Sequence, residues 1–150
     1  MGTKLIAQNR KARRDYELLE KYECGLSLLG TEIKSLRTGS ANLKESYVKC
    51  KNGELFLVGC HISPYSHASV DAHDPLRERK VLMHRREIEH CIKSVREKGL
   101  SLVPVSLYFR RGLCKVEVAI ARGKKLYDKR EDLKAKGADR ALQRALSRRR

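Results

Sequence analysis

Histidines and carboxylates are the side chains of this sequence that could do chemistry. His61, His67 and His73 gather in one stretch with Asp71 and Asp74. No i, i+4 helical pair or tight turn brings two of them together, whereas zinc sites usually use closely spaced ligand pairs. Histidines in a loop of a basic protein are therefore the favoured interpretation, and we expect neither a metal nor a cofactor.

Carboxylates could also serve a nuclease. Glu23, Glu32, Asp71 and Asp74 are far apart in the sequence but could surround a magnesium ion. The chain has no nucleophile elbow, no glycine-rich phosphate loop and no paired acids. We therefore expect a protein that is not an enzyme, with a magnesium nuclease as an open alternative.

A basic cluster near the N-terminus fits RNA better than catalysis. The segment "NRKARRDY" (9–16) places four cations beside Tyr16, which suits phosphate contacts next to a stacking partner. The alternative is a solvated charged face. The basic turn "RRG" (110–112) is ambiguous in the same way.

The composition supports a polyanionic partner. The 150 residues include 34 Lys and Arg against 18 Asp and Glu, a net charge of +16. Such a surplus attracts nucleic acid first and anionic membranes second. Residues 124–150 hold 11 basic and 4 acidic residues, so the last segment is dense in charge, but the body is basic too.

The cysteines and the apolar pattern indicate the compartment. Five cysteines form no C-x-x-C pair, and the N-terminus lacks the apolar stretch of a signal peptide. No apolar run approaches the roughly 20 residues needed to cross a bilayer. We expect a reduced, cytoplasmic protein of one domain and a tail, with no membrane partner.

Two hairpins are predicted by alternation and turn residues. "KVEVAIA" (115–121) alternates with Val116, Val118 and Ile120 on one face, and it follows "LVPVSLYF" (102–109) across the basic turn. In 46–62, Asn52-Gly53 supplies the positive φ angles of a tight turn. A longer strand is predicted from Tyr16 to Leu29, bent at Gly25.

Helical signals are fewer. "HRREIEHCIKSVREKG" (84–99) places apolar residues at i, i+3, i+4 and i+7 and ends at a glycine. A shorter helix is predicted over 30–39, with Thr31 as its N-cap. Residues 63–80 have the composition of a long loop. The fold class is mainly β with flanking helices, as a closed antiparallel barrel.

After Gly123 the pattern changes. Large apolar residues are too few to offset the ordering cost of 27 residues, so the tail 124–150 should be disordered when free. Lys136, Arg140, Arg144 and Arg148 recur at i+4, so a helix could form against an anionic partner.

Six segments together resemble one family. They are "IAQNRKARRDY", "GTEIKSLRTGSANLKESYV", "GELFLVGCHISPY", "HDPLRERKVLMHRREI", "GLSLVPVSLYF" and "ARGKKLYDKRED". In this order and spacing they closely resemble the SsrA-binding protein (small protein B) family, over nearly the whole chain.

The resemblance implies a fold and a role. It implies an oligonucleotide-binding (OB) barrel over 1–123 with about three helices, and a monomer that acts in bacterial trans-translation. The protein would bind the tRNA-like domain of tmRNA, with elongation factor Tu on alanyl-tmRNA, and enter the A site of a stalled 70S ribosome. Its tail would enter the decoding centre and the mRNA channel, and it would perform no chemistry.

The resemblance also assigns residues for RNA contact. The family glutamate falls on Glu23, and its Leu and polar residue before the long helix fall on Leu82 and His84. An acid in a basic surface can accept from base or 2′-OH donors, which lysine cannot do. The other candidate contacts are Asn9, Arg10, Lys11, Arg13, Arg14, Lys34 and Arg37.

In the tail, the family motif is intact in "GKKLYDKR". Tyr127 offers a ring for stacking on a ribosomal RNA base, and the cations beside it can meet phosphates. Relatives often carry a Trp where this chain has Gly137-Ala138. The tail candidates are Lys124, Lys125, Tyr127, Asp128, Lys129, Arg130 and the i+4 row Lys136, Arg140, Arg144 and Arg148. A constitutive ribosomal RNA-binding protein is the other alternative.

Overall fold

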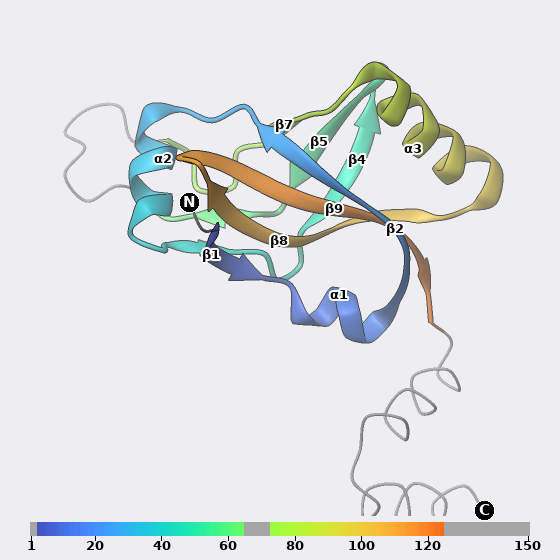
Figure 1. The fold of residues 1–150 in the computed structure, drawn as a ribbon, viewed down its shortest axis with the longest axis horizontal. Helices are drawn as coiled ribbons and strands as arrows, with labels where there is room; N and C mark the ends of the chain where they lie inside the picture. The colour runs from blue at the N-terminus through green and yellow to red at the C-terminus, as the bar shows by residue number, and fades with distance from the viewer. Residues whose placement is uncertain (1–2, 65–72, 125–150) are drawn as a thin grey trace, which may run out of the picture.

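Antiparallel strands dominate the computed structural model, which describes residues 3–64 and 73–124. The strands are β1 (Thr3–Gln8), β2 (Tyr16–Leu26), β3 (Ala41–Asn42), β4 (Tyr47–Lys51), β5 (Glu54–Val58), β6 (His61–Ile62), β7 (Arg79–Leu82), β8 (Ser101–Arg110) and β9 (Leu113–Gly123). The helices are α1 (Arg10–Asp15), α2 (Gly30–Arg37) and α3 (Arg85–Lys98). The described part is therefore mainly β, as the sequence patterns predicted, with the three helices that the family resemblance implied (Figure 1).

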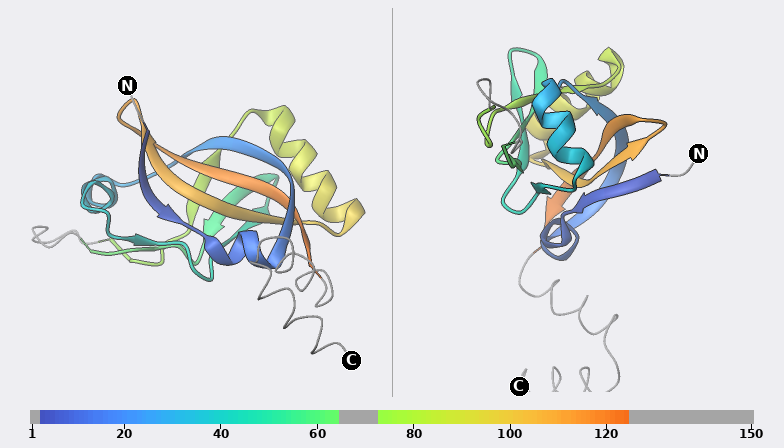
Figure 2. Two further views of the ribbon diagram at one scale, coloured as in Figure 1. Left: turned by 60° about the horizontal axis from the view of Figure 1, so that its bottom comes forward. Right: turned by 90° about the vertical axis from the view of Figure 1, so that its left-hand side faces the viewer.

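Seven strands form one sheet in the order β1-β8-β4-β5-β7-β2-β9, with β8 also paired to β9. A second sheet pairs β3 with β6. The long strands β2, β8 and β9 curve together around the core (Figure 2). Figure 1 shows α2 and α3 at opposite ends of the molecule.

Both predicted hairpins are confirmed, and their turns explain the register. Asn52 and Gly53 have φ of 52° and 75°, and Arg111 and Gly112 have φ of 53° and 78°. Two consecutive positive φ angles match the twist of the flanking strands and let the hairpins close in two residues. The first hairpin is shorter than predicted, because β5 ends at Val58 and His61–Ile62 pair with β3 instead.

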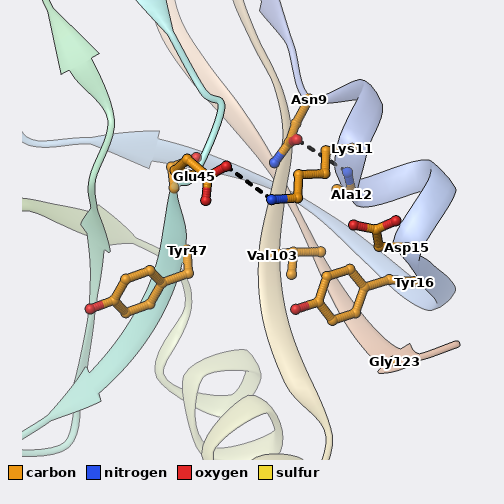
Figure 3. A pocket seen from close by; sticks show the side chains of 10 residues that line it. Asn9, Lys11, Ala12, Asp15, Tyr16, Glu45, Tyr47, Val103 and Gly123 are labelled. Carbon is orange, nitrogen blue, oxygen red and sulfur yellow. Dashed lines mark hydrogen bonds and ion pairs between the residues drawn. The ribbon is translucent and has the colours of Figure 1, made fainter. Parts of the chain in front are cut away.

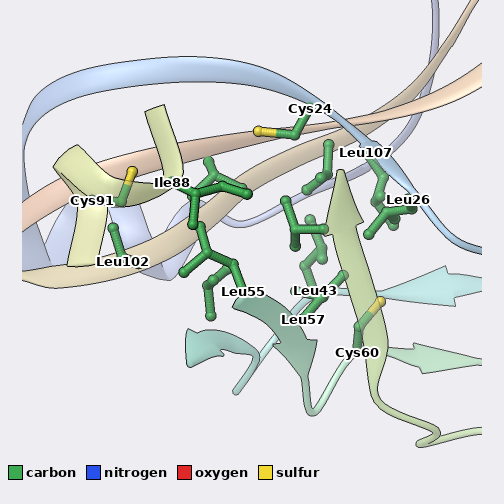
Figure 4. Packing of buried hydrophobic residues seen from close by; sticks show 14 of the residues in the cluster. Cys24, Leu26, Leu43, Leu55, Leu57, Cys60, Ile88, Cys91, Leu102 and Leu107 are labelled. Carbon is green, nitrogen blue, oxygen red and sulfur yellow. The ribbon is translucent and has the colours of Figure 1, made fainter. Parts of the chain in front are cut away.

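The main core lies on the inner face of the curved sheet, and both α2 and α3 contribute buried residues to it. Figure 4 shows Ile88 and Cys91 of α3 beside Leu55 and Leu102 of the sheet. All four side chains are buried. The helix ends as predicted, because Gly99 adopts the left-handed conformation with φ 64°.

A second, smaller core was not foreseen. Ala119 and Ala121, which the alternation placed on the outer face of β9, are fully buried against Val103 and Val105 of β8. Ala12 of α1 covers them. Small side chains on a strand let a helix approach closely, so α1 packs on this part of β9.

Several local predictions were wrong. The N-cap of α2 is Leu29, not Thr31, and the Glu32 carboxylate accepts its N–H at 2.8 Å. β2 ends at Leu26 rather than Leu29. Strand β7 begins inside the segment 63–80 that the sequence presented as a loop. The sequence patterns also missed β1 and α1.

A buried ion cluster ties these elements together. Glu32 and Arg79 are both fully buried, and Arg79 Nε donates to Glu32 Oε2 at 2.6 Å. Arg77 Nη2 donates to Glu32 Oε1 at 2.6 Å, and Arg79 Nη1 donates to the Cys60 carbonyl at 2.6 Å. Burial alone would raise the pKa of Glu32, but hydrogen bonds from Arg77, Leu29 N–H and Arg79 hold it below its ordinary value. The cluster therefore joins α2, β7 and the turn between β5 and β6 as a charged unit.

We expect Arg79→Met to lower the free energy of unfolding by about 3–5 kcal/mol, because it leaves a buried carboxylate short of a partner. Urea unfolding followed by circular dichroism measures this loss. Lys80→Met is the matched control on the same strand, since the Lys80–Glu54 pair is exposed and should contribute less than about 1 kcal/mol. Equal losses in the two variants would contradict a structural role for the cluster.

Candidate nucleic-acid interface

Glu23 lies on the outer face of β2, held by two donors from β8. The Tyr108 hydroxyl donates to Glu23 Oε2 at 2.5 Å, and Arg110 Nη1 donates to the same oxygen at 2.7 Å. The bond from Tyr108 lowers the pKa of the Glu23 carboxyl, and Arg110 adds to the effect. Glu23 is therefore an ionised, oriented acceptor on a basic surface.

Leu82 lies close to Glu23, as the predicted surface requires. It pairs across the strands with Gly25, two residues beyond Glu23 on the same face of β2. A Cβ on Gly25 would come within 3.4 Å of the Leu82 Cβ, so the absent side chain lets Leu82 lie over β2. Leu82 is 47% exposed, so its side chain is accessible to a ligand.

His84 stands at the start of α3. It occupies the N-cap position with extended backbone, and its side chain makes no capping hydrogen bond. The side chain is exposed. Glu23, Leu82 and His84 thus come from β2, β7 and the turn into α3, and the pairing of Leu82 with Gly25 brings β7 beside β2 although the two strands are distant in sequence.

The basic cluster of 9–16 forms α1. Arg10, Lys11, Arg13 and Arg14 are exposed on it, and the Glu45 carboxylate accepts from Lys11 Nζ at 2.9 Å and raises the pKa of Lys11. Within the described residues, the side chains of Arg10 and Arg13 make neither a hydrogen bond nor an ion pair. They are the cations of α1 most available to phosphates.

Asn9 has a different part from the cations that follow it. It is buried, its Nδ2 donates to the Pro104 carbonyl at 2.9 Å, and its Oδ1 accepts the Ala12 N–H at 3.1 Å. Both amide atoms are thus used inside the protein. Asn9 starts α1 and fixes it on β8 rather than presenting its side chain to a ligand.

A hollow of about 500 Å³ opens beside α1. Tyr16 and Tyr47 flank it, with the Lys11–Glu45 pair at its rim (Figure 3). Gly123 also lines it, and the Lys124 N–H donates to the Asp15 carbonyl at 2.9 Å. The sequence predicted Tyr16 beside the cations but gave no signal for Tyr47, which comes from β4.

The remaining candidates lie elsewhere. Lys34 and Arg37 are exposed on α2, and the Arg37 carbonyl accepts from Lys4 at 3.5 Å. Figure 1 places α2 far from α1, so these cations and those of α1 belong to different parts of the surface. Of the tail candidates only Lys124 is described; the others lie outside the described residues.

The catalytic and metal alternatives find no support in the described residues. Glu32 is engaged by two arginines and Glu23 by Tyr108 and Arg110, so these two carboxylates do not share a site. His73 Nε2 lies 2.9 Å from the Ile62 carbonyl and its Nδ1 3.0 Å from Thr31 Oγ1. No group of three His, Cys, Asp or Glu within 3–64 and 73–124 could hold a metal ion. His67 and Asp71 lie outside the described residues.

None of the helices described is long and apolar enough to span a membrane.

A curved antiparallel sheet with helices at its ends and a basic surface is an architecture common among small nucleic-acid-binding proteins. Comparison with known proteins narrows this class.

The family model of the SmpB protein matches residues 6–148. The SsrA-binding protein of Syntrophobacter fumaroxidans is 56% identical over 148 residues, covering 99% of this chain and 92% of that protein. That of Geobacillus thermodenitrificans is 56% identical over 142 residues, covering 95% and 92%. A solved structure described as "tmRNA-SmpB: a journey to the center of the bacterial ribosome" superposes with a TM-score of 0.66 at 45% identity, over 93% of this chain and 95% of that one. The chain belongs to the SmpB protein family.

We expect Asn9→Ala to lower the free energy of unfolding by about 1–2 kcal/mol, because α1 loses its cap. Arg10→Ala, one residue on, should leave stability unchanged within about 0.5 kcal/mol. Thermal and urea unfolding of the two variants check this difference. An Asn9→Ala variant as stable as Arg10→Ala would show that Asn9 does not position α1.

Proposed function

We propose that this protein binds the tRNA-like domain of tmRNA and carries it to the A site of stalled ribosomes. The observation that carries the proposal is the likeness, at 45% identity over 93% of the chain, to the tmRNA–SmpB structure. The family match over 6–148 supports it, because it includes the tail as well as the body.

The surface formed by Glu23, Leu82 and His84 is the proposed contact with tmRNA. An RNA loop offers splayed bases and 2′-hydroxyl groups, which need acceptors as well as cations. Glu23 supplies a fixed acceptor, Leu82 an apolar contact and His84 a polar ring. Arg10 and Arg13 of α1, with Lys11 and Arg14, would meet phosphates, and Lys34 and Arg37 would add attraction from α2.

Asn9 enters this proposal only as the residue that holds α1 in place. A direct RNA contact by its amide would require breaking its bonds to Pro104 or Ala12. The cations of α1 therefore depend on Asn9 for their position.

We further propose that the sheet is an OB-type barrel. Its pairings run in a circuit from β8 through β4, β5, β7, β2 and β9 back to β8. The joins β4–β8 and β2–β7 are short, with one and two residue pairs. OB barrels are typically only partly closed and bind oligonucleotides on their strands and loops.

The proposed division of the chain is a body, 1–123, and a tail, 124–150. Gly123 ends the last strand, and the tail begins beside α1 and the hollow between Tyr16 and Tyr47. Tyr127 and the tail cations would act in the decoding centre and mRNA channel. On this proposal the protein works as a monomer in the cytoplasm with elongation factor Tu and alanyl-tmRNA, needs no cofactor and catalyses no reaction.

We expect Glu23→Lys to weaken binding to the tRNA-like domain by about 1–3 kcal/mol, although it adds positive charge, because a specific acceptor is lost. Glu97→Lys, an equal change of charge on the exposed side of α3, is the control and should bind as tightly as the original protein or tighter. Gel-shift titration at physiological salt measures both. Equal affinities for the two variants would contradict the proposed contact between Glu23 and tmRNA.

Removing residues 124–150 should leave a folded body that still binds tmRNA, because the buried residues described all precede Gly123. The same truncation should abolish peptidyl transfer to alanyl-tmRNA on stalled ribosomes.

Tyr127→Ala in the full-length protein should also reduce this transfer, through a lost stacking contact of about 1–3 kcal/mol. Loss of tmRNA binding on truncation would refute the division at Gly123, and full transfer would refute the role of the tail.

A further inference from the structure

We propose that Tyr108 and Arg110 are positioning residues that make Glu23 a one-oxygen acceptor, so that the RNA group it recognises is a single N–H or O–H donor. The inference rests on the proposed function, in which Glu23 contacts tmRNA. Beyond that function, it names the residues that hold the Glu23 carboxylate and the kind of RNA donor that the carboxylate can accept.

Both donors of β8 reach the same oxygen of Glu23. Tyr108 and Arg110 bond to Oε2 at 2.5 and 2.7 Å. Within 3–64 and 73–124, no hydrogen bond or ion pair involves Oε1. The side chain remains 35% exposed, so Oε1 is the acceptor left for a ligand.

The two donors reach across an intervening strand. Glu23 of β2 is paired with Glu117 of β9, and β9 separates β2 from β8. A like charge directly opposite Glu23 would push its carboxylate away, so the bonds from β8 decide where the side chain points. An exposed glutamate without such bonds would populate several rotamers and lose entropy on binding.

The electrostatics favour the same arrangement. The hydrogen bond from Tyr108 is the largest influence on Glu23, and it lowers the pKa of the carboxyl. Burial and the bond to Glu23 in turn raise the pKa of Tyr108. Glu23 therefore stays ionised and accepts only, while Tyr108 keeps the proton that it donates.

A carboxylate held by one oxygen selects its ligand. Guanine presents two parallel N–H donors on its Watson–Crick edge, which suit a carboxylate with both oxygens free. Oε2 of Glu23 already accepts two bonds, so one donor fits better: the exocyclic amino group of adenine or cytosine, or a ribose 2′-OH.

The two hydrogen bonds from Tyr108 and Arg110 to Glu23 Oε2, called here the Glu23 anchor, can be tested with Glu23→Gln. An amide has one oxygen and one NH2 group in place of two equivalent oxygens. With Tyr108 and Arg110 present, the amide oxygen must face them and the NH2 group must face the RNA. We expect a loss of affinity of about tenfold or more for a transcript of the tRNA-like domain, since donor then meets donor. In a Tyr108→Phe, Arg110→Met background the amide can turn its oxygen to the RNA, and the added loss should shrink to about twofold or less.

The four proteins of this cycle are compared by gel shift after circular dichroism has shown that each is folded. A Glu23→Gln loss of the same size in both backgrounds would overturn the anchor. The original protein is also titrated with a shuffled RNA. If it does not prefer the tRNA-like transcript, the proposed function itself fails, and the two failures are thus distinguishable.

A pH profile separates positioning from a merely structural role. Above its pKa, which Tyr108 lowers, Glu23 is purely an acceptor, whereas below it the protonated carboxyl also presents a donor, so the affinity falls as the pH falls through that lowered value. In Tyr108→Phe the pKa should return toward 4.5 and the loss should begin at higher pH. Tyr22→Phe is the control, because it removes a hydroxyl that donates to another exposed glutamate of β2, Glu20, at 3.2 Å. The same profile for all three proteins would count against the proposal.

Four transcripts, each carrying one nucleotide type in its 2′-deoxy form, identify the donor. If the Glu23→Gln loss disappears in one of them, the donor is a 2′-OH of that nucleotide type. If the loss persists in all four, the donor is on a base, and a fifth transcript with inosine in place of guanosine decides which kind. A loss that inosine does not change leaves a single base donor and supports the proposal, whereas a loss that disappears with inosine points to the paired donors of guanine and would overturn it.

Discussion

The bond between Glu32 and Arg79 is the constraint on which the rest of the structure depends. Neither group can be solvated, so each needs the other together with the Arg77 guanidinium and the Cys60 carbonyl. The pairing fixes the start of α2 relative to β7. Because β7 pairs with β2 at Gly25 and Leu82, the placement of Leu82 beside Glu23 follows from a charge pair on the other side of the sheet.

The proposed RNA surface is positioned by strands of the same sheet. β2, β9 and β8 lie side by side, so residues from positions 23, 108 and 110 meet without any loop between them. Groups held on strands keep their geometry better than groups on loops. The cations of α1 depend in turn on the small second core and on Asn9, which together seat a helix of only six residues.

The sequence predicts the hairpins and α3 because each has a local signal: alternation with a tight-turn pair, or a 3.6-residue period ending at Gly99. It does not predict α1, whose six residues bury only Ala12 and so show no periodicity. The sequence pattern placed Arg79 in an exposed loop, because its burial depends on an ion pair with Glu32, which is 47 residues away in the sequence. The Glu23 anchor was missed for the same reason: Tyr108 lies 85 residues from it, and only strand register brings them together. Glu23, Leu82 and His84 were found through family resemblance and not through any pattern.

The hydrogen bond from Lys124 to Asp15 gives the last 26 residues a fixed point of departure at the end of α1. From that point an extended chain of this length spans at most about 90 Å. The same residues wound into a helix span about 40 Å. A partner that induces the helix would thus draw the far end of the chain inward by about half its reach. A helical tail would thus set a distance as well as a conformation, and the end of α1 would be the point from which that distance is measured.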